Sequence, residues 1–124
     1  ITIRQAANTA ANKIESVVGL SGTGITVYNS VMCSNGTAAV NSYMMVGIGE
    51  SSTTANATGT VVVAATAAVA DATYTTAYLS KDQPDGYHYY AMLESNTATG
   101  TMTWFGDNDK PLLRGSGISA MVWM

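Results

Sequence analysis

His88 is the only histidine in the chain and is therefore the first residue to consider for catalysis. It lies in the aromatic run Tyr87-His88-Tyr89-Tyr90, which is typical of a β-strand. A Ser-His-Asp or Cys-His arrangement needs a nucleophile beside the imidazole, and no Gly-x-Ser-x-Gly pattern nominates a serine. We expect His88 to be a half-exposed strand residue, and the protein not to be an enzyme.

The eight carboxylates do not form a convincing catalytic pair. Glycosidase chemistry needs two carboxyl groups that face each other across a sugar cleft, whereas most of these residues lie in predicted turns and loops. Asp107-Asn108-Asp109 resembles the start of a calcium loop, because hard cations prefer clustered oxygen ligands. The triplet lacks the glycine and the distal glutamate of that pattern. We interpret it as a turn and expect no metal site and no cofactor.

Cys33 is the only cysteine, so one chain can form neither an internal disulfide nor a cysteine-based zinc site. The sequence favours a small buried side chain at this position, with an intermolecular bridge as the alternative. Two Asn-x-Thr glycosylation motifs begin at Asn35 and Asn56, both in predicted loops.

Aromatic side chains provide a candidate binding surface. Antiparallel neighbours bring side chains of one face together, so four residues could form an aromatic platform: Tyr87, Tyr89, Tyr90 and Trp104. Such rings bind sugars and lipid interfaces, and they also fill protein cores. Both interpretations are open at this stage.

The composition predicts a weakly charged surface that favours association between copies of the chain. Charged residues make up 10% of the chain, well below the roughly 25% that is usual in soluble domains. Low charge leaves little repulsion between copies. The net charge of −3, with five basic residues scattered along the chain, argues against a nucleic-acid partner.

The first 19 residues predict an amphipathic helix. Thr2 and Gln5 form a capping box, and Gly19 provides a C-terminal stop. Apolar residues recur between them at helical spacing, and we interpret five of them as a face for assembly: Ile3, Ala7, Ala10, Ile14 and Val17. This face could pack on the chain's own sheet or on the same helix of other copies.

Beyond the helix, residues 25–124 alternate with a period of two and predict about seven antiparallel strands. Asn35-Gly36 predicts a hairpin over residues 25–48, because this dipeptide favours a tight turn. Further strand pairs are expected at 60–70 with 73–79 and at 87–94 with 100–105, and a last strand at 117–124. The length fits one domain over 1–124, mainly β, as a β-sandwich or a curved sheet.

The order of a helix followed by an antiparallel sheet, together with the segment GTMTWFG at 100–106, resembles the globular heads of type IV pilins. This resemblance implies an α+β pilin-head arrangement as the alternative fold, and a fibre as the assembled form.

These features together predict a non-enzymatic structural subunit that assembles with copies of itself into a pilus-like extracellular fibre or a virion shell or tail. The alternative is a secreted β-sandwich module that binds glycans or membrane lipid. No apolar run approaches the roughly 20 residues of a membrane span, and the start at Ile1 suggests a processed or trimmed chain. We expect an extracellular, cell-surface or virion location.

Overall fold

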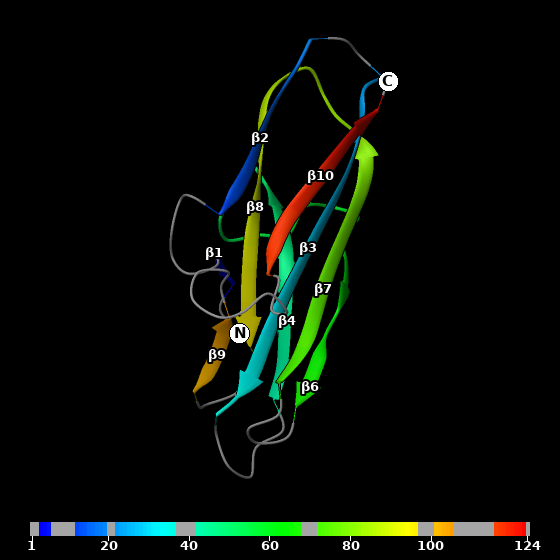
Figure 1. Ribbon diagram of the computed structural model, residues 1–124. Coiled ribbons are helices and arrows are strands. Elements are labelled where there is room, and N and C mark those ends of the chain that lie inside the picture. The colour runs from blue at the N-terminus through cyan, green and yellow to red at the C-terminus, as the bar shows by residue number, and fades with distance from the viewer. Residues whose placement is uncertain are drawn as a thin grey trace.

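The computed structural model describes residues 3–5, 12–19, 22–36, 42–67, 72–96, 101–105 and 116–123. These residues form ten strands in two antiparallel sheets that pack face to face (Figure 1). The expectation of a mainly β fold is confirmed. Among the described residues no helix is found, and so none could span a membrane.

The first sheet, sheet A, is built around β8 (Gly86–Asn96) and β4 (Ser42–Glu50). Beyond β4 lies the short β6 (Ala65–Ala67). On the other side of β8, two strands share one position end to end: β1 (Arg4–Gln5) and β2 (Lys13–Val18).

The second sheet, sheet B, has the same plan. Its central strands are β3 (Gly24–Asn35) and β7 (Ala72–Asp82), with the short β5 (Val61–Val63) beyond β7. Two strands again share the position on the other side of β3. They are β10 (Gly117–Trp123), opposite the first part of β3, and β9 (Met102–Phe105), opposite its end.

Alternation of side chains along the central strands produces the core between the sheets. Successive side chains of a strand point to opposite faces, so every second residue of β3, β4 and β7 is turned inward. The principal buried cluster joins both sheets through Ile25, Val27, Val31, Val46, Ile48, Ala57, Ala77, Leu79, Tyr90 and Met92. Asn29 is also fully buried, and its Nδ2 donates to the backbone oxygen of Gly47 at 2.9 Å, which ties β3 to β4.

The predicted N-terminal helix is wrong in the part of 1–19 that the structure describes. Arg4–Gln5 and Lys13–Val18 are strands that pair with β8, while residues 6–11, including Ala7 and Ala10, lie outside the described residues. The helical spacing of apolar residues did not prevail over tertiary pairing, because the β-branched Ile14, Val17 and Val18 suit a strand beside β8.

Two of the predicted hairpins are also wrong, although their strands exist. β3 lies in sheet B and β4 in sheet A, so Asn35-Gly36 does not connect neighbouring strands, and the Gly36 amide instead donates to the oxygen of Thr101 at 2.9 Å. Likewise β9 pairs with β3 and not with β8. From β2 to β9, each consecutive strand lies in the sheet opposite to the one before it.

The predicted strand at 60–70 is divided between the sheets. β5 pairs with β7, as expected of this segment, but β6 pairs with β4. The last carbonyl of β5, at Val63, accepts a hydrogen bond from Thr75 Oγ1 at 2.8 Å. This bond satisfies a backbone group at the point where the chain leaves sheet B, since a buried polar group needs a partner.

Candidate interaction surfaces

The outward face of sheet B carries no acidic or basic side chain over five consecutive cross-strand rows. We call this surface the uncharged face. Each row crosses β3 and β7, with β10 or β9 on one side and, in two rows, β5 on the other. The three rows that begin on β10 are Met121, Thr26 and Ser80; Ser119, Tyr28, Tyr78 and Val61; and Gly117, Ser30, Thr76 and Val63. The two rows that begin on β9 are Phe105, Met32 and Tyr74; and Thr103, Ser34 and Ala72.

Several large apolar and aromatic side chains of the uncharged face are solvent-exposed. Val61 and Val63 are 59% and 60% exposed, and Tyr28, Tyr74 and Met121 are also open to solvent. Tyr28 and Tyr78 are directly opposite each other, with ring centroids 5.0 Å apart and ring planes inclined by 54°. Hydroxyl, aromatic and aliphatic groups on a broad sheet surface can bury area against another molecule without desolvating an ion.

Sheet A carries a different cluster at its β2 edge. The carboxylate of Glu15 accepts a hydrogen bond from Tyr87 Oη at 2.6 Å and lies 2.6 Å from Lys13 Nζ. The Lys13 ammonium is also 5.3 Å from the centroid of the Tyr89 ring, within the range of a cation–π contact.

The titration of this cluster follows from its contacts. The hydrogen bonds from Lys13 and then Tyr87 lower the pKa of Glu15, and the bond to Glu15 raises the pKa of Lys13. The same carboxylate raises the pKa of Tyr87, because the phenol proton is held by Glu15. The group therefore holds a carboxylate, an ammonium and a neutral phenol at neutral pH. It has neither a free base nor an activated nucleophile.

The predicted aromatic platform is not assembled in the structure. Tyr87 and Tyr89 share the outward face of sheet A, whereas Tyr90 is fully buried, and its hydroxyl donates to Gln83 Oε1 at 3.3 Å. Trp104 belongs to sheet B and packs partly buried against the core, including Cys33. The exposed aromatic pair of Tyr28 and Tyr78 was not singled out from the sequence, although both residues alternate with buried neighbours.

The other residues considered from the sequence have structural surroundings. His88 is a half-exposed residue of β8, and its Nε2 lies 2.9 Å from the oxygen of Pro84. Cys33 is buried, and burial raises the pKa of its thiol to about 11. Of the two glycosylation motifs, the Asn35 side chain is buried and the Asn56 side chain is on the surface.

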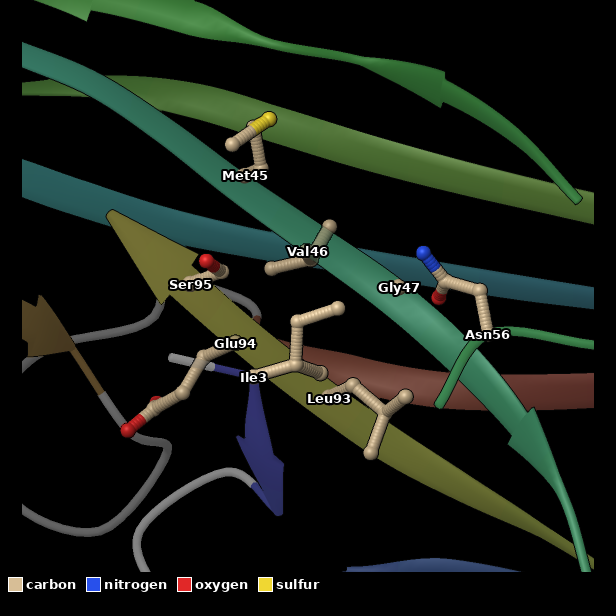
Figure 2. A pocket seen from close by; sticks show the side chains of 8 residues that line it. All are labelled: Ile3, Met45, Val46, Gly47, Asn56, Leu93, Glu94 and Ser95. Carbon is tan, nitrogen blue, oxygen red and sulfur yellow. The ribbon is translucent and has the colours of Figure 1, made fainter. Parts of the chain in front are cut away.

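Three of the residues proposed as an assembly face are described, and they do not form one surface: Ile3, Ile14 and Val17. Ile14 is half-buried on β2, and Val17 on the same strand is 79% exposed. Ile3 precedes β1 and lines a pocket of about 250 Å³ over the outward side of sheet A. Figure 2 shows Ile3 beside Leu93 in front of β8, while the carboxylate of Glu94 points away from them.

This pocket is lined mainly by residues of β4 and β8. Asn56, from the loop after β4, forms part of its rim, and its Oδ1 accepts a hydrogen bond from the backbone N–H of Ile48 at 3.1 Å. Within the described ranges, no three His, Cys, Asp or Glu side chains are grouped to hold a metal ion. Asp107–Asp109 lies outside these ranges.

No family model, curated protein or solved structure matches this chain. The resemblance to pilin heads thus rests on the sequence segment alone, and the N-terminal helix that it required is not found in the described residues. The candidate surfaces must be judged on their own chemistry.

Proposed function

We propose that the protein is a non-enzymatic structural subunit that assembles with copies of itself into an extracellular fibre or a virion shell or tail. The observation that carries this proposal is the uncharged face of sheet B. A sheet surface of five rows without an ion, with valine, methionine and tyrosine exposed on it, is suited to contact with another protein surface.

Self-association follows from the absence of charge on this face. Two copies of a surface that lacks ions meet without like-charge repulsion and without stripping water from a buried ion. The described charged side chains lie outside these five rows, and Asp82 of β7 stands in the next row beyond Ser80. Lys13 and Glu15 are on sheet A, and Lys81 and Glu50 form an ion pair that bridges the two sheets.

The connections of the sandwich are compatible with this role. Strands that cross between two sheets rather than forming hairpins are characteristic of jelly-roll sandwiches, an architecture used by capsid and lectin domains. This support is an analogy of fold, and it fits assembly and glycan binding equally well.

The proposal is tested by measuring the mass of the purified protein by light scattering over a wide concentration range. We expect concentration-dependent oligomers, and we expect Tyr78→Lys and Val61→Lys to weaken association at least tenfold by placing charge on the uncharged face. Val17→Lys is the matched control, because Val17 is exposed on the opposite sheet. A folded wild type that stays monomeric at millimolar concentration would overturn the proposal.

The second candidate function is a secreted module that binds glycans or membrane lipid. The cluster of Lys13, Glu15, Tyr87 and Tyr89 favours it, since a tyrosine ring beside a carboxylate and an ammonium can stack on a sugar and bond its hydroxyls. Screens against glycans and against liposomes test this function, with Tyr89→Ala as the variant that should abolish binding. Equal binding by this variant would exclude the cluster as the site.

A further inference from the structure

Within the strands that the structure describes, three of the four sheet edges carry a feature that discourages pairing with another strand. Natural sheets block their edges with charged residues or with very short strands. β5 and β6 have three residues each, and β2 carries Lys13 and Glu15. The remaining edge, at β10, has neither protection.

β10 is a regular seven-residue strand without a charged residue or proline, GISAMVW. Each of its residues has a partner in β3, from Gly117 with Ser30 to Trp123 with Gly24, so no bulge interrupts it. Among the described strands β10 pairs with β3 alone, and β2 of sheet A lies near it without pairing, so no described strand is hydrogen-bonded to its other edge. Such an edge is a template for a further strand.

We propose that β10 pairs antiparallel with β10 of a second copy, about a two-fold axis at Ala120, so that two B sheets join into one. This inference rests on the proposed self-assembly and names the contact that begins it. A two-fold contact uses the same surface on both copies, so the strand must be complementary to its own reverse.

The sequence of β10 meets this condition. With Ala120 opposite Ala120, Ser119 faces Met121 of the second copy, and Gly117 faces Trp123 of the second copy. Small residues thus oppose large ones throughout the outward face, and no pair brings like charges together.

The inward face of β10 gives an independent reason for a second copy at this edge. Val122 is opposite the fully buried Ile25 and so lies on the core side of sheet B, yet it is 54% exposed. In the proposed register, Val122 contacts Ile118 of the second copy, which completes a core row left open at the edge.

Trp123 also fits this register. Its indole covers Gly24, where a Cβ atom would overlap the ring, so the tryptophan already packs over a glycine within its own chain. Gly117 of the second copy would stand on the other side and has no side chain to displace the ring. Within its own chain, Gly117 has open space above its Cα.

Disulfide formation tests both the edge and the register. Directly opposite residues of an antiparallel pair have Cα atoms about 4.5–5.5 Å apart, within the range of a disulfide, whereas diagonal neighbours at about 7–8 Å exceed it. Ala120→Cys should therefore form a covalent dimer under mild oxidation. Ser119→Cys alone and Met121→Cys alone should not, but a mixture of these two variants should cross-link. Wild type is the background control, because Cys33 is buried.

Each outcome decides the proposal. The proposal is supported if two samples cross-link at least tenfold faster than wild type: Ala120→Cys alone, and the mixture of Ser119→Cys with Met121→Cys. Neither component of the mixture should cross-link by itself. Equal rates for Ala120→Cys and Ser119→Cys, or no cross-linking in any variant, overturn it. Light scattering on the wild type separates the two proposals. If the wild type forms larger assemblies but Ala120→Cys forms no covalent dimer, the structural-subunit function stands and the β10 contact is wrong. If Ala120→Cys forms dimers but the wild type never grows beyond a dimer, the β10 contact stands and the structural-subunit function is wrong.

Discussion

Gly47→Ala probes the contact between the loop after β4 and sheet A. The added Cβ would overlap Asn56 Oδ1 and come within 2.9 Å of Asn56 Cγ and 3.2 Å of its Nδ2. The carboxamide must then move away, which breaks its 3.1 Å hydrogen bond from the Ile48 amide. Because Ile48 is fully buried, its N–H is left without a partner.

The expected cost follows from this geometry. An unsatisfied buried donor destabilises the folded state by about 1–3 kcal/mol. Replacing glycine with alanine offsets about 0.4–1 kcal/mol of this, because it lowers the conformational entropy of the unfolded chain. We expect Gly47→Ala to lower the free energy of unfolding by about 1–2 kcal/mol. Asn56→Ala removes the same hydrogen bond and should cost a similar amount. In the Asn56→Ala background the obstacle is gone, so Gly47→Ala should then raise stability by about 0.4–1 kcal/mol.

Urea unfolding of the two single variants and the double variant, followed by tryptophan fluorescence, measures this coupling. At the usual urea dependence for small domains, the expected loss moves the midpoint by roughly 1 M. Gly49→Ala is the matched control, because its Cβ would overlap the backbone oxygen of Ser52 and Asn56→Ala should not rescue it. If the effects of Gly47→Ala and Asn56→Ala are additive within error, the reasoning fails.

Three further predictions concern buried and half-buried groups. Burial raises the pKa of Cys33 to about 11, so iodoacetamide at pH 8 should label it only as fast as the protein opens; complete labelling of the native protein within minutes would contradict this. Burial, followed by the charge of Glu50, raises the pKa of Tyr90 to about 12, against 10.0 for the free phenol. The unfolded state therefore loses this proton first, and up to about 1–2 kcal/mol of stability, fully present below pH 10, should be lost between pH 10 and 12; unfolding curves that are unchanged over this range would refute it. Glu50→Gln breaks the 2.6 Å ion pair with the half-buried Lys81 and should cost about 1–2 kcal/mol in urea unfolding, whereas Glu15→Gln, at an exposed pair, should cause no measurable change.

The fold class was predictable from the sequence because it depends on local alternation. Residues 25–35 alternate between inward and outward positions, and the structure follows this pattern along β3. β4, β7, β8, β9 and β10 likewise overlap predicted strands. Alternation identifies a strand and its buried face, but it contains no information on which strand lies alongside.

The errors arose where long-range pairing decided the outcome. Asn35-Gly36 favours a hairpin locally, yet β3 obtains its partners from β7, β9 and β10, far along the chain. The apolar spacing of residues 13–18 predicts a helix, but pairing with β8 makes this segment a strand. The pattern of a single segment cannot show whether long-range pairing will override its local preference, because the pairing energy depends on the partner strand.

The candidate surfaces were predictable only as residue types. Tyr87 and Tyr89 were identified, but Tyr90 alternates onto the opposite face and Trp104 belongs to the other sheet. The uncharged face combines residues of five strands, so only the registers of sheet B reveal it. Low overall charge was the sole signal in the sequence, and it does not locate the surface.

The alternation of consecutive strands between sheets affects how the protein can be made. β3 emerges early from the ribosome, but its neighbours on both sides belong to the second half of the chain. β8, which organises the other sheet, is likewise late. Of the described strands, those of sheet A are complete only once β8 has been made, and those of sheet B only once β10 has been made, and such non-local closure is slow. During synthesis β3 must therefore wait for β7, and β2 for β8, before either can pair with a described strand. In this interval the unpaired strands of a charge-poor chain are most prone to associate with other chains.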